Sequence, residues 1–326
     1  MTASPTTAPT EKTGSPRTTA TRDRSAATGL DRIARPDGTF AVVAMDQRNT
    51  LRRMFTAVGR TPDDADMTDL KADIARALSP SASALLVDPD LGAPACLRPG
   101  VMAPGCGVMV AADPADKGSW EGEPRATREK SLDAAWVRAQ GGDALKFLLQ
   151  LRAGRPRTPG GPDLEQEVLD VTRAIVEDCR QQGIPSVIEN LIYPIPGAEP
   201  LTPQERSDVI VSSARMLDEV GCDLLKLEYP GSPEACRRVA EVVTGPWAVL
   251  SAGVEFDDFL DVLRISCDEG GASGFIAGRA FWKDAVDLDG PDRYEFLSTE
   301  GRRRLDTCVG AVDGRARPWQ SVRGAS

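Results

Sequence analysis

The sequence predicts an α/β protein made of a single (β/α)8 barrel, the TIM-barrel architecture, with a disordered N-terminal tail. Short apolar runs alternate with helical stretches from residue 39 onward, which is typical of a parallel sheet. The runs recur at intervals of roughly 33 residues, the length of one strand-helix unit. A chain of 326 residues also has room for one barrel of about 250 residues and a tail.

The two ends of the chain are expected to lie outside the barrel. Residues 1–28 are almost entirely Thr, Ser, Pro, Ala and charged residues. Such a segment buries too little apolar surface to offset the entropy lost on ordering. We therefore expect a disordered tail over residues 1–28, the barrel over residues 29–314 and a frayed end over residues 315–326.

Eight apolar runs are predicted as the strands of the barrel, because each is short and bounded by turn residues. They cover residues 40–46, 84–88, 107–113, 143–149, 186–189, 223–228, 247–251 and 274–278. Helices are predicted at residues 163–182, 207–220 and 257–269, each ending before a glycine that can cap it.

Three loops that follow predicted strands are rich in turn residues, at residues 113–124, 153–162 and 193–203. Each would lie at the C-terminal rim of the barrel, where barrel enzymes build their active sites. Asp88 and Asp113, which also end strands, each precede a proline. We interpret these two aspartates as turn formers.

The composition excludes several kinds of chemistry. The absence of histidine rules out a Ser-His-Asp triad, a histidine general base and histidine-containing zinc sites. The seven cysteines form no Cys-x-x-Cys pair, so reduced, mostly buried thiols are expected. A net charge of −10 argues against nucleic-acid and membrane partners. With no apolar run of the length of a membrane span and no signal peptide, a cytoplasmic location is expected.

Lys226 lies inside the predicted strand 223–228, DLLKLE. Alternation along the strand places it on one face with Leu224 and Glu228. One interpretation is a structural ion pair between Lys226 and Glu228, because buried charges are usually paired. The other is a nucleophilic amine whose pKa is lowered.

Lys146 is a second lysine in a strand interior, on the same face as Ala144 and Leu148, so both ammonium groups can point into the barrel. Repulsion between them, together with partial burial, is expected to lower the pKa of an amine and to increase the neutral form that attacks a carbonyl. Glu189 lies on the strand between the two lysines and is predicted to transfer protons as a carbinolamine forms and breaks down.

Glycines and polar groups also follow the last two strands, as Ser-Ala-Gly at 251–253 and Ala-Gly-Arg at 277–279. Backbone N–H groups and a guanidinium would meet there, where barrels commonly bind phosphate. The sequence therefore predicts an anion site.

Seven segments, taken in order, are similar to a known family. They are AMDQR at 44–48, SASALLVDPDLGAPA at 81–95, DALKFLL at 143–149, VIE at 187–189, DLLKLE at 223–228, PWAVLSAGV at 246–254 and GASGFIAGRAFW at 271–282. From about residue 29 to residue 282, the chain resembles the class I (Schiff-base) tagatose 1,6-bisphosphate aldolase family. That family includes relatives that cleave 6-deoxy-6-sulfofructose 1-phosphate.

The resemblance implies a role for each matching residue. Lys226 is implied as the Schiff-base lysine, Glu189 as the acid/base and Lys146 as the second active-site lysine. Asp46 and Gln47 are implied to contact substrate hydroxyls. The phosphate grip is implied at Ser251, Gly253, Gly278 and Arg279.

The resemblance further implies reversible cleavage of a ketose 1-phosphate into dihydroxyacetone phosphate and an aldehyde, with no metal and no other cofactor. In the site, Glu228 is expected to be a neighbour that orients the Lys226 amine. The expected partners are a small-molecule sugar phosphate or sulfo-sugar phosphate and further copies of the chain in a homo-oligomer.

The chain departs from the family pattern at residues 190–193, NLIY, and in the loops 115–124 and 153–162. These loops would hold the aldehyde half of the substrate. The aldehyde therefore stays open between glyceraldehyde 3-phosphate, sulfolactaldehyde and an unphosphorylated compound. Two other functions are kept as alternatives: a noncatalytic barrel that binds a sugar phosphate, and an isomerase or dehydratase that uses Glu189.

Overall fold

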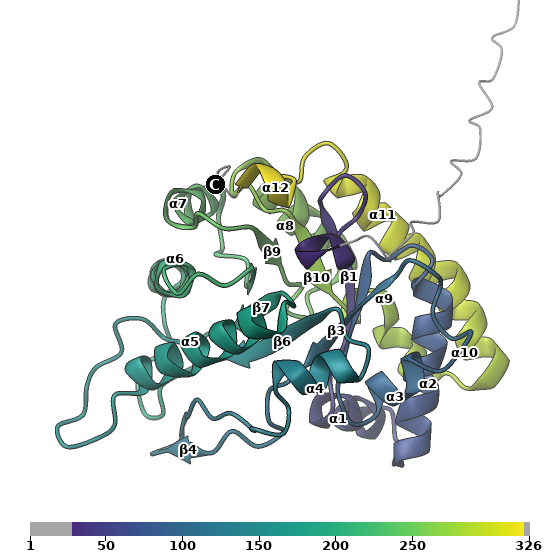
Figure 1. The fold of residues 1–326 in the computed structure, drawn as a ribbon, viewed down its shortest axis with the longest axis horizontal. Coiled ribbons are helices and arrows are strands. Elements are labelled where there is room, and N and C mark those ends of the chain that lie inside the picture. The colour runs from purple at the N-terminus through teal and green to yellow at the C-terminus, as the bar shows by residue number, and fades with distance from the viewer. Residues whose placement is uncertain (1–27, 323–326) are drawn as a thin grey trace, which may run out of the picture.

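The computed structural model describes residues 28–322 and contains a closed barrel of parallel strands in the order β1-β10-β9-β8-β7-β6-β3-β2 (Figure 1). The barrel strands are β1 (Phe40–Met45), β2 (Ala84–Val87), β3 (Gly107–Ala111), β6 (Ala144–Leu149), β7 (Ser186–Asn190), β8 (Leu224–Leu227), β9 (Trp247–Val249) and β10 (Gly274–Ala277). Each predicted run forms one of them, which confirms the (β/α)8 barrel.

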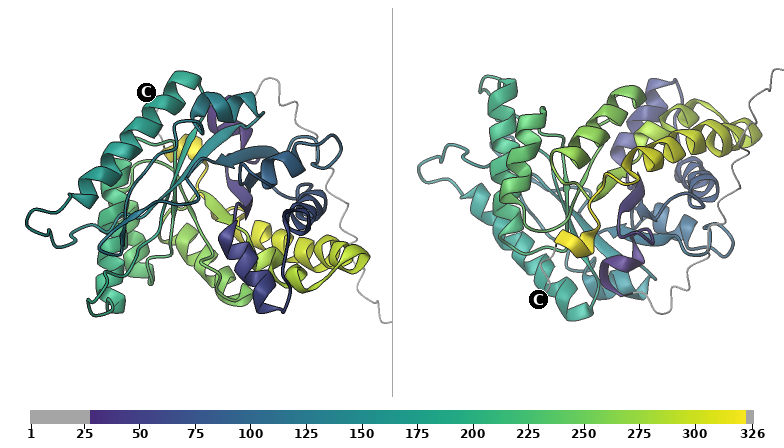
Figure 2. Two further views of the ribbon diagram at one scale, coloured as in Figure 1. Left: turned by 90° about the horizontal axis from the view of Figure 1, so that it is seen from below. Right: turned by 90° about the horizontal axis from the view of Figure 1, so that it is seen from above.

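Helices surround the strands in both views of Figure 2. They are α1 (Asn49–Ala57), α2 (Asp64–Leu78), α3 (Gly92–Cys96), α4 (Ala134–Ala139), α5 (Leu164–Gln182), α6 (Pro203–Asp218), α7 (Pro233–Val242), α8 (Phe256–Asp268), α9 (Arg279–Trp282), α10 (Gly290–Phe296), α11 (Arg302–Val312) and α12 (Trp319–Val322). α5 packs on β7, α6 on β8 and α8 on β10, as expected when each helix covers the outside of the sheet.

Local signals set where the helices begin and end. Thr202 and Glu205 form a capping box, in which each side chain accepts a hydrogen bond from the backbone N–H of the other residue. A cap of this kind is worth about 1 kcal/mol. It starts α6 at Pro203, earlier than the predicted start at residue 207.

Alternation along the strands divides the core in two. An inner cluster fills the barrel, and an outer cluster lies between the strands and the helices. On β6 and β8, Ala144 and Leu224 belong to the inner cluster, whereas the intervening Leu225 belongs to the outer one. Lys146 and Lys226 lie two residues beyond these inner side chains, so both project into the barrel as predicted.

The loop after β3 contains an antiparallel hairpin that the sequence did not predict. It consists of β4 (Ser119–Trp120) and β5 (Glu123–Pro124), and β4 is visible at the lower edge of Figure 1. Glu121 and Gly122, which join the two strands, have φ angles of 49° and 82°. These strands are too short, and their residues too polar, to show strand periodicity.

The end of the chain differs from the frayed tail expected from residue 315. Ala316 is buried, Arg317 N donates to Ala272 O at 3.0 Å, and Trp319 N donates to Gly38 O at 3.0 Å. These contacts hold the chain against the N-terminal side of the barrel as far as Val322. The predicted tail at residues 1–28 falls, apart from its last residue, outside the described residues.

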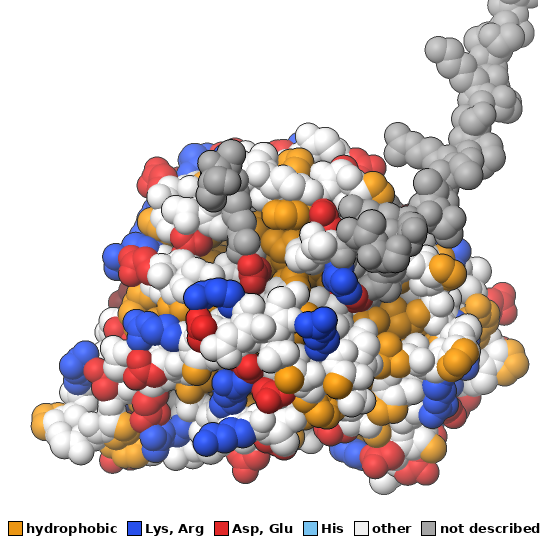
Figure 3. Space-filling model, in the orientation of Figure 1, with side chains coloured by type: hydrophobic (Ala, Val, Ile, Leu, Met, Phe, Trp, Pro, Cys, Tyr) orange, Lys and Arg blue, Asp and Glu red, His pale blue; other side chains and the backbone are white. Residues whose placement is uncertain are grey.

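The described surface and thiols agree with the composition. All seven cysteines are buried thiols that form no disulfide bond, as predicted. On the face shown in Figure 3, acidic and basic side chains are interspersed, so this face lacks the continuous basic surface of nucleic-acid binders. Over residues 28–322, the helices are too short or too polar to cross a membrane.

Candidate active site

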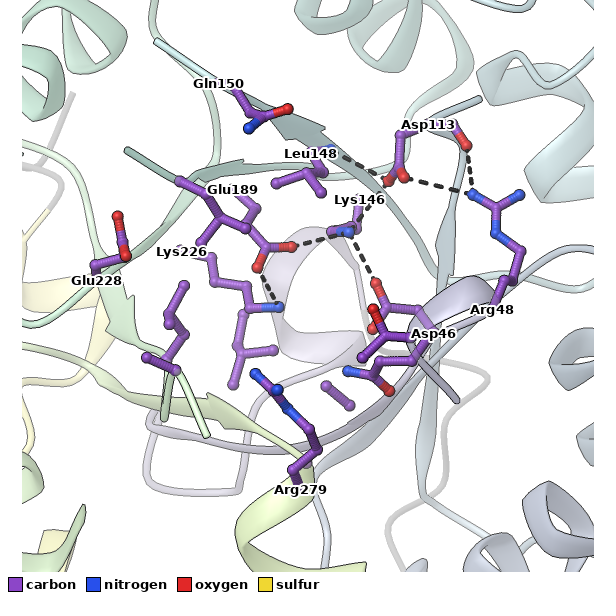
Figure 4. A pocket seen from close by; sticks show the side chains of 18 of the residues that line it. Asp46, Arg48, Asp113, Lys146, Leu148, Gln150, Glu189, Lys226, Glu228 and Arg279 are labelled. Carbon is purple, nitrogen blue, oxygen red and sulfur yellow. Dashed lines mark hydrogen bonds and ion pairs between the residues drawn. The ribbon is translucent and has the colours of Figure 1, made fainter. Parts of the chain in front are cut away.

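A cavity of about 530 Å³ opens at the C-terminal ends of the strands (Figure 4). Residues from seven of the barrel strands, or from the loops after them, line it, as in other barrel enzymes. It brings together all the predicted site residues except Gly253: Asp46, Gln47, Lys146, Glu189, Lys226, Glu228, Ser251, Gly278 and Arg279.

Glu189 joins the two lysines at the centre of the cavity (Figure 4). Its Oε1 lies 2.8 Å from Lys226 Nζ, and its Oε2 lies 2.8 Å from Lys146 Nζ. Glu189 and Lys226 are direct partners in the register of β7 and β8, so the backbone itself holds this pair together. All three side chains are buried, which strengthens their electrostatic interactions.

Lys146 is surrounded by carboxylates. Besides Glu189, its Nζ lies 2.8 Å from Asp46 Oδ2 and 3.1 Å from Asp113 Oδ1. Burial alone would lower the pKa of Lys146, but these three carboxylates outweigh burial and raise the pKa well above its ordinary value. The predicted lowering of the pKa is therefore wrong for Lys146. Lys226, by contrast, forms its ion pair in the described chain with one carboxylate, that of Glu189.

The same cluster holds Asp46 ionised. Burial would raise the pKa of Asp46, but the nearby ammonium groups of Lys146 and Lys226 hold the pKa well below its usual range. Within residues 28–322, no group of His, Cys, Asp or Glu side chains is arranged to hold a metal ion. The Lys146 ammonium group occupies the position among these three carboxylates that a metal ion would otherwise take.

The two strand-end aspartates interpreted as turn formers have different roles. Asp88 does form a turn, since it accepts hydrogen bonds from Leu91 N at 2.8 Å and Gly92 N at 3.1 Å. For Asp113 the interpretation is wrong, because its carboxylate binds Lys146 and accepts from Leu148 N at 3.2 Å. Both aspartates follow a strand and precede a proline, so the local sequence could not separate them.

Asp88 also forms a fully buried ion pair with Lys71 of α2. Lys71 Nζ donates to Met45 O at 2.9 Å and to Gln47 O at 3.0 Å. These two carbonyls lie on either side of Asp46. Lys71 therefore fixes the end of β1 from outside the barrel.

Glu228 does not pair with Lys226, contrary to the structural ion pair considered from the sequence. β8 ends at Leu227, so strand alternation no longer applies at residue 228. The Glu228 carboxylate instead accepts from Ile192 N at 2.7 Å and lies 2.5 Å from the Arg206 guanidinium. Burial raises the pKa of this carboxyl, which lines one side of the cavity (Figure 4).

Arg279 and its surroundings form one end of the cavity. Gly253, with a φ of +84°, lies against the Arg279 guanidinium, and a Cβ at this position would come within 2.9 Å of the guanidinium carbon. Gly278 approaches β1 so closely that a Cβ would lie 1.8 Å from Ala44 O. Glycine is required at residue 278 by this close contact with the backbone, and at residue 253 by the positive φ angle. The lack of a side chain at Gly253 leaves room for the Arg279 guanidinium.

The lining residues that the sequence did not predict include Arg48, Lys117 and Tyr193. All three belong to loops whose course depends on tertiary contacts. Arg48 Nη2 donates to Asp113 O at 2.8 Å and pairs with the Asp113 carboxylate at 3.5 Å. The segment AMDQR, which carries Arg48 beside the predicted Asp46 and Gln47, was the available signal.

A family model described as DeoC/LacD family aldolase matches residues 40–284, which is the whole barrel including the cavity. The chain belongs to this aldolase family. The family resemblance noted in the sequence is thereby confirmed. As an aldolase, the protein is a carbon–carbon lyase, so the noncatalytic and isomerase or dehydratase alternatives do not hold.

Relatives of this aldolase match nearly the full chain. Tagatose 1,6-diphosphate aldolase 2 of Streptococcus pyogenes serotype M3 is 26% identical over 316 residues, which cover 87% of this chain and 93% of the relative. Tagatose 1,6-diphosphate aldolase of Listeria monocytogenes serotype 4a is 26% identical over 332 residues, covering 91% and 94%.

Solved structures share the fold of the aldolase. An archaeal fructose 1,6-bisphosphate aldolase superposes with a TM-score of 0.56 at 17% identity, covering 85% of this chain and 98% of its own. Fructose-bisphosphate aldolase of Plasmodium falciparum gives a TM-score of 0.66 at 11% identity, covering 88% and 94%. At these identities the likeness concerns the architecture alone.

Proposed function

We propose that this aldolase is a class I, Schiff-base enzyme that reversibly cleaves a ketose 1-phosphate into dihydroxyacetone phosphate and an aldehyde. The observation that carries the proposal is the unequal surroundings of the two buried lysines. Lys146 is held as a cation by three carboxylates, whereas Lys226 contacts the single carboxylate of Glu189 at 2.8 Å. Lys226 therefore has a base in contact and is the better nucleophile.

The first stage joins the substrate to Lys226. The neutral amine attacks the C2 carbonyl, and the carbonyl oxygen takes up a proton to give a carbinolamine. Glu189, in contact with Lys226 Nζ, transfers protons as the carbinolamine loses water and becomes a protonated imine. In an archaeal fructose-1,6-bisphosphate aldolase with the same fold, the catalytic Lys is covalently bound to a carbinolamine intermediate, which supports this stage.

The second stage breaks the C3–C4 bond. Glu189 removes the proton of the C4 hydroxyl, the C3–C4 electron pair moves into the imine to form an enamine, and the aldehyde leaves. Protonation at C3 and hydrolysis then release dihydroxyacetone phosphate and regenerate Lys226. Lys146, fixed as a cation, stabilises negative charge that develops on the reacting oxygens.

Gln47 and Asp46 are proposed to hold the substrate hydroxyls. In the described part of the chain, the buried Oε1 of Gln47 has no hydrogen-bond partner. A buried acceptor without a donor is costly, and a substrate hydroxyl would supply that donor. Arg279, with Ser251 and the backbone of Gly278, is proposed to hold the C1 phosphate.

The proposed substrates are tagatose or fructose 1,6-bisphosphate and 6-deoxy-6-sulfofructose 1-phosphate. The names of the two bacterial relatives favour a tagatose bisphosphate. A cleavage assay that compares the three sugars by the rate of triose phosphate release would rank them.

Borohydride trapping tests the Schiff base. Incubation with dihydroxyacetone phosphate and sodium borohydride should add one reduced triose phosphate per chain, located at Lys226 by peptide mass spectrometry. Lys226→Met should abolish both the adduct and cleavage. Lys130→Met, which removes an exposed lysine, is the matched control and should be labelled like the wild type. An unlabelled wild-type protein, or a label that survives in Lys226→Met, would refute the mechanism.

A further inference from the structure

The charged side chains that line the cavity are not all paired. Arg48, Lys146 and Lys226 each contact at least one carboxylate. Arg279 and Lys117 differ, since neither has a carboxylate of the described residues within ion-pairing distance while both line the cavity. An unpaired cation in a partly enclosed cavity is a natural contact for an anionic ligand.

Lys117 lies on the opposite side of the cavity from Arg279. Lys117 Nζ donates to Leu148 O, on β6, at 2.8 Å, and Arg279 follows β10. In the closed order β1-β10-β9-β8-β7-β6-β3-β2, three strands separate β10 from β6 in either direction, so the two strands face each other across the barrel. Figure 4 shows Leu148 and Arg279 on opposite sides, with Lys146 and Lys226 between them.

Lys117 also lies nearer the mouth of the cavity than the reacting groups. Leu148 is two residues beyond Lys146 on β6, which corresponds to roughly 7 Å along the strand. A substrate whose C2 is at Lys226 and whose C1 group is at Arg279 would therefore direct its far end toward Lys117.

The position of Lys117 is fixed by the hairpin β4–β5 that follows it. Glu123 of β5 accepts from Arg155 at 2.9 and 2.5 Å and from the Tyr193 hydroxyl at 2.9 Å. These three buried residues belong to the loops after β3, β6 and β7, and we call them the loop latch. Arg125 N also donates to Gly118 O at 3.3 Å, which closes the base of the hairpin beside Lys117. A cation held in this way is pre-organised for a ligand.

We propose that Lys117 binds a second anionic group of the substrate, a phosphate monoester or a sulfonate at the end of the aldehyde half. The proposal rests on the function proposed above and narrows it. The substrate would carry an anion at each end, one on Arg279 and one on Lys117. An unphosphorylated aldehyde half would leave Lys117 without a counter-ion.

The surroundings of Lys117 agree with this role. Burial lowers the pKa of Lys117 to about 8, although the Asp113 carboxylate opposes the shift. The amine of the free enzyme is therefore a cation at pH 7 and loses its charge as the pH rises through about 8. An anion bound beside it would favour the charged form.

The test compares substrates with one and two anions. For Lys117→Gln, kcat/KM for fructose or tagatose 1,6-bisphosphate, or for 6-deoxy-6-sulfofructose 1-phosphate, should fall roughly 10- to 100-fold, the loss expected for one charge-assisted contact. The kcat/KM for fructose 1-phosphate, which has no distal anion, should change less than about twofold by the same reasoning. Lys130→Gln removes an exposed lysine of the same loop and should affect neither class. The two-anion sugar whose kcat/KM falls most in Lys117→Gln shows whether the distal anion is a phosphate or a sulfonate.

The pH dependence of kcat/KM tests the proposal independently. In the wild type, kcat/KM for the two-anion sugar divided by that for fructose 1-phosphate should decline above pH 8, because Lys117 becomes neutral there. Lys117→Arg keeps its charge, so this ratio should stay level up to pH 9.5. Equal losses for both substrate classes, or no loss, in Lys117→Gln would overturn the proposal.

Failure of the proposed function would look different. No adduct at Lys226 and no cleavage of any sugar would refute the aldolase mechanism, whatever Lys117 does. Calorimetric binding of fructose 1,6-bisphosphate to Lys226→Met, with and without Lys117→Gln, then decides the anion contact without turnover. A weaker affinity of the double variant supports the contact, and an equal affinity overturns it.

Discussion

Lys146 and Lys226 carry the same functional group in adjoining places, and their neighbours make them different. Glu189 contacts both ammonium groups, but Asp46 and Asp113 contact Lys146 alone. In the proposed mechanism, the two further carboxylates therefore keep Lys146 charged, whereas Lys226 is the amine that forms the covalent bond. Placing titratable groups in unlike surroundings is a general way to divide roles in an active site.

Replacement of Lys146 should destabilise the fold as well as stop catalysis. Lys146→Met leaves Asp46, Asp113 and Glu189 buried without their shared cation, which costs about 3–5 kcal/mol when a buried pair is broken. Urea denaturation at pH 7 measures the loss, with Lys130→Met as the exposed control.

The loss of stability in Lys146→Met should also depend on pH. The pKa of Asp46 is lowered in the folded wild type from 3.8, so its contribution is present above pH 4 and is lost as the pH falls through the lowered value. In Lys146→Met, Asp113 keeps its ion pair with Arg48 and Glu189 keeps its ion pair with Lys226. Asp46 loses its ion pair, so it takes up a proton on acidification, which relieves the destabilisation. The difference in free energy of unfolding between the wild type and Lys146→Met should become smaller from pH 7 to pH 4. A gap that stays constant would contradict the account.

At the scale of elements, the loop latch joins three rim loops that share no secondary structure. Glu123 and Arg155 are both buried, and the hydrogen bond from Arg155 is the main reason that the pKa of Glu123 is lowered. Arg155 also lies 6.0 Å from the centre of the Trp120 ring, so the same residue supports both strands of the hairpin.

Breaking the latch should loosen the hairpin. Glu123→Gln removes the negative charge beside Arg155 and Tyr193, so amide protons of residues 113–133 should exchange faster, which hydrogen-exchange mass spectrometry measures. KM for a two-anion sugar should rise by more than KM for fructose 1-phosphate. Glu121→Gln, an exposed change in the same hairpin, is the control. Unchanged exchange in Glu123→Gln would show that the latch does not hold the loop.

At the scale of the whole molecule, the barrel closes where β10, its last strand along the chain, pairs with β1, its first. Gly274 has a φ of +131°, and a Cβ there would lie 2.0 Å from Phe40 O. Gly278 makes the same kind of close approach at the other end of the strand. Closure of the sheet depends on these two positions having no side chain.

Gly274→Ala should therefore destabilise the protein by about 3 kcal/mol or more, because overpacking and backbone strain add. Gly310→Ala is the matched control. Gly310 lies in α11 with open space around it, so alanine should stabilise the protein by about 0.5–1 kcal/mol. Thermal and urea unfolding of both variants would measure the difference. If the two variants had equal stabilities, the backbone where β10 pairs with β1 would be able to move enough to accommodate a side chain.

The sequence predicted the features that repeat and those that follow a strand directly. The regular recurrence of short apolar runs located the barrel strands. The alternation of side chains along those strands placed Lys146, Glu189 and Lys226 inside the barrel. The sequence did not reveal the hairpin β4–β5 or Lys117, because a polar rim loop takes its course from tertiary contacts such as the latch. Glu228 was misjudged because its strand stops one residue earlier.

Lys71 acts on the site from α2, outside the barrel, with its own side chain fully buried. Its ammonium binds the carbonyls of Met45 and Gln47 and the carboxylate of Asp88. The aim of the Asp46 side chain between those carbonyls thus depends on α2. Because loss of either residue would leave the other charge buried without its partner, we expect Lys71 and Asp88 to change together among relatives. Joint retention of the two residues would preserve the position of Asp46 in the cavity.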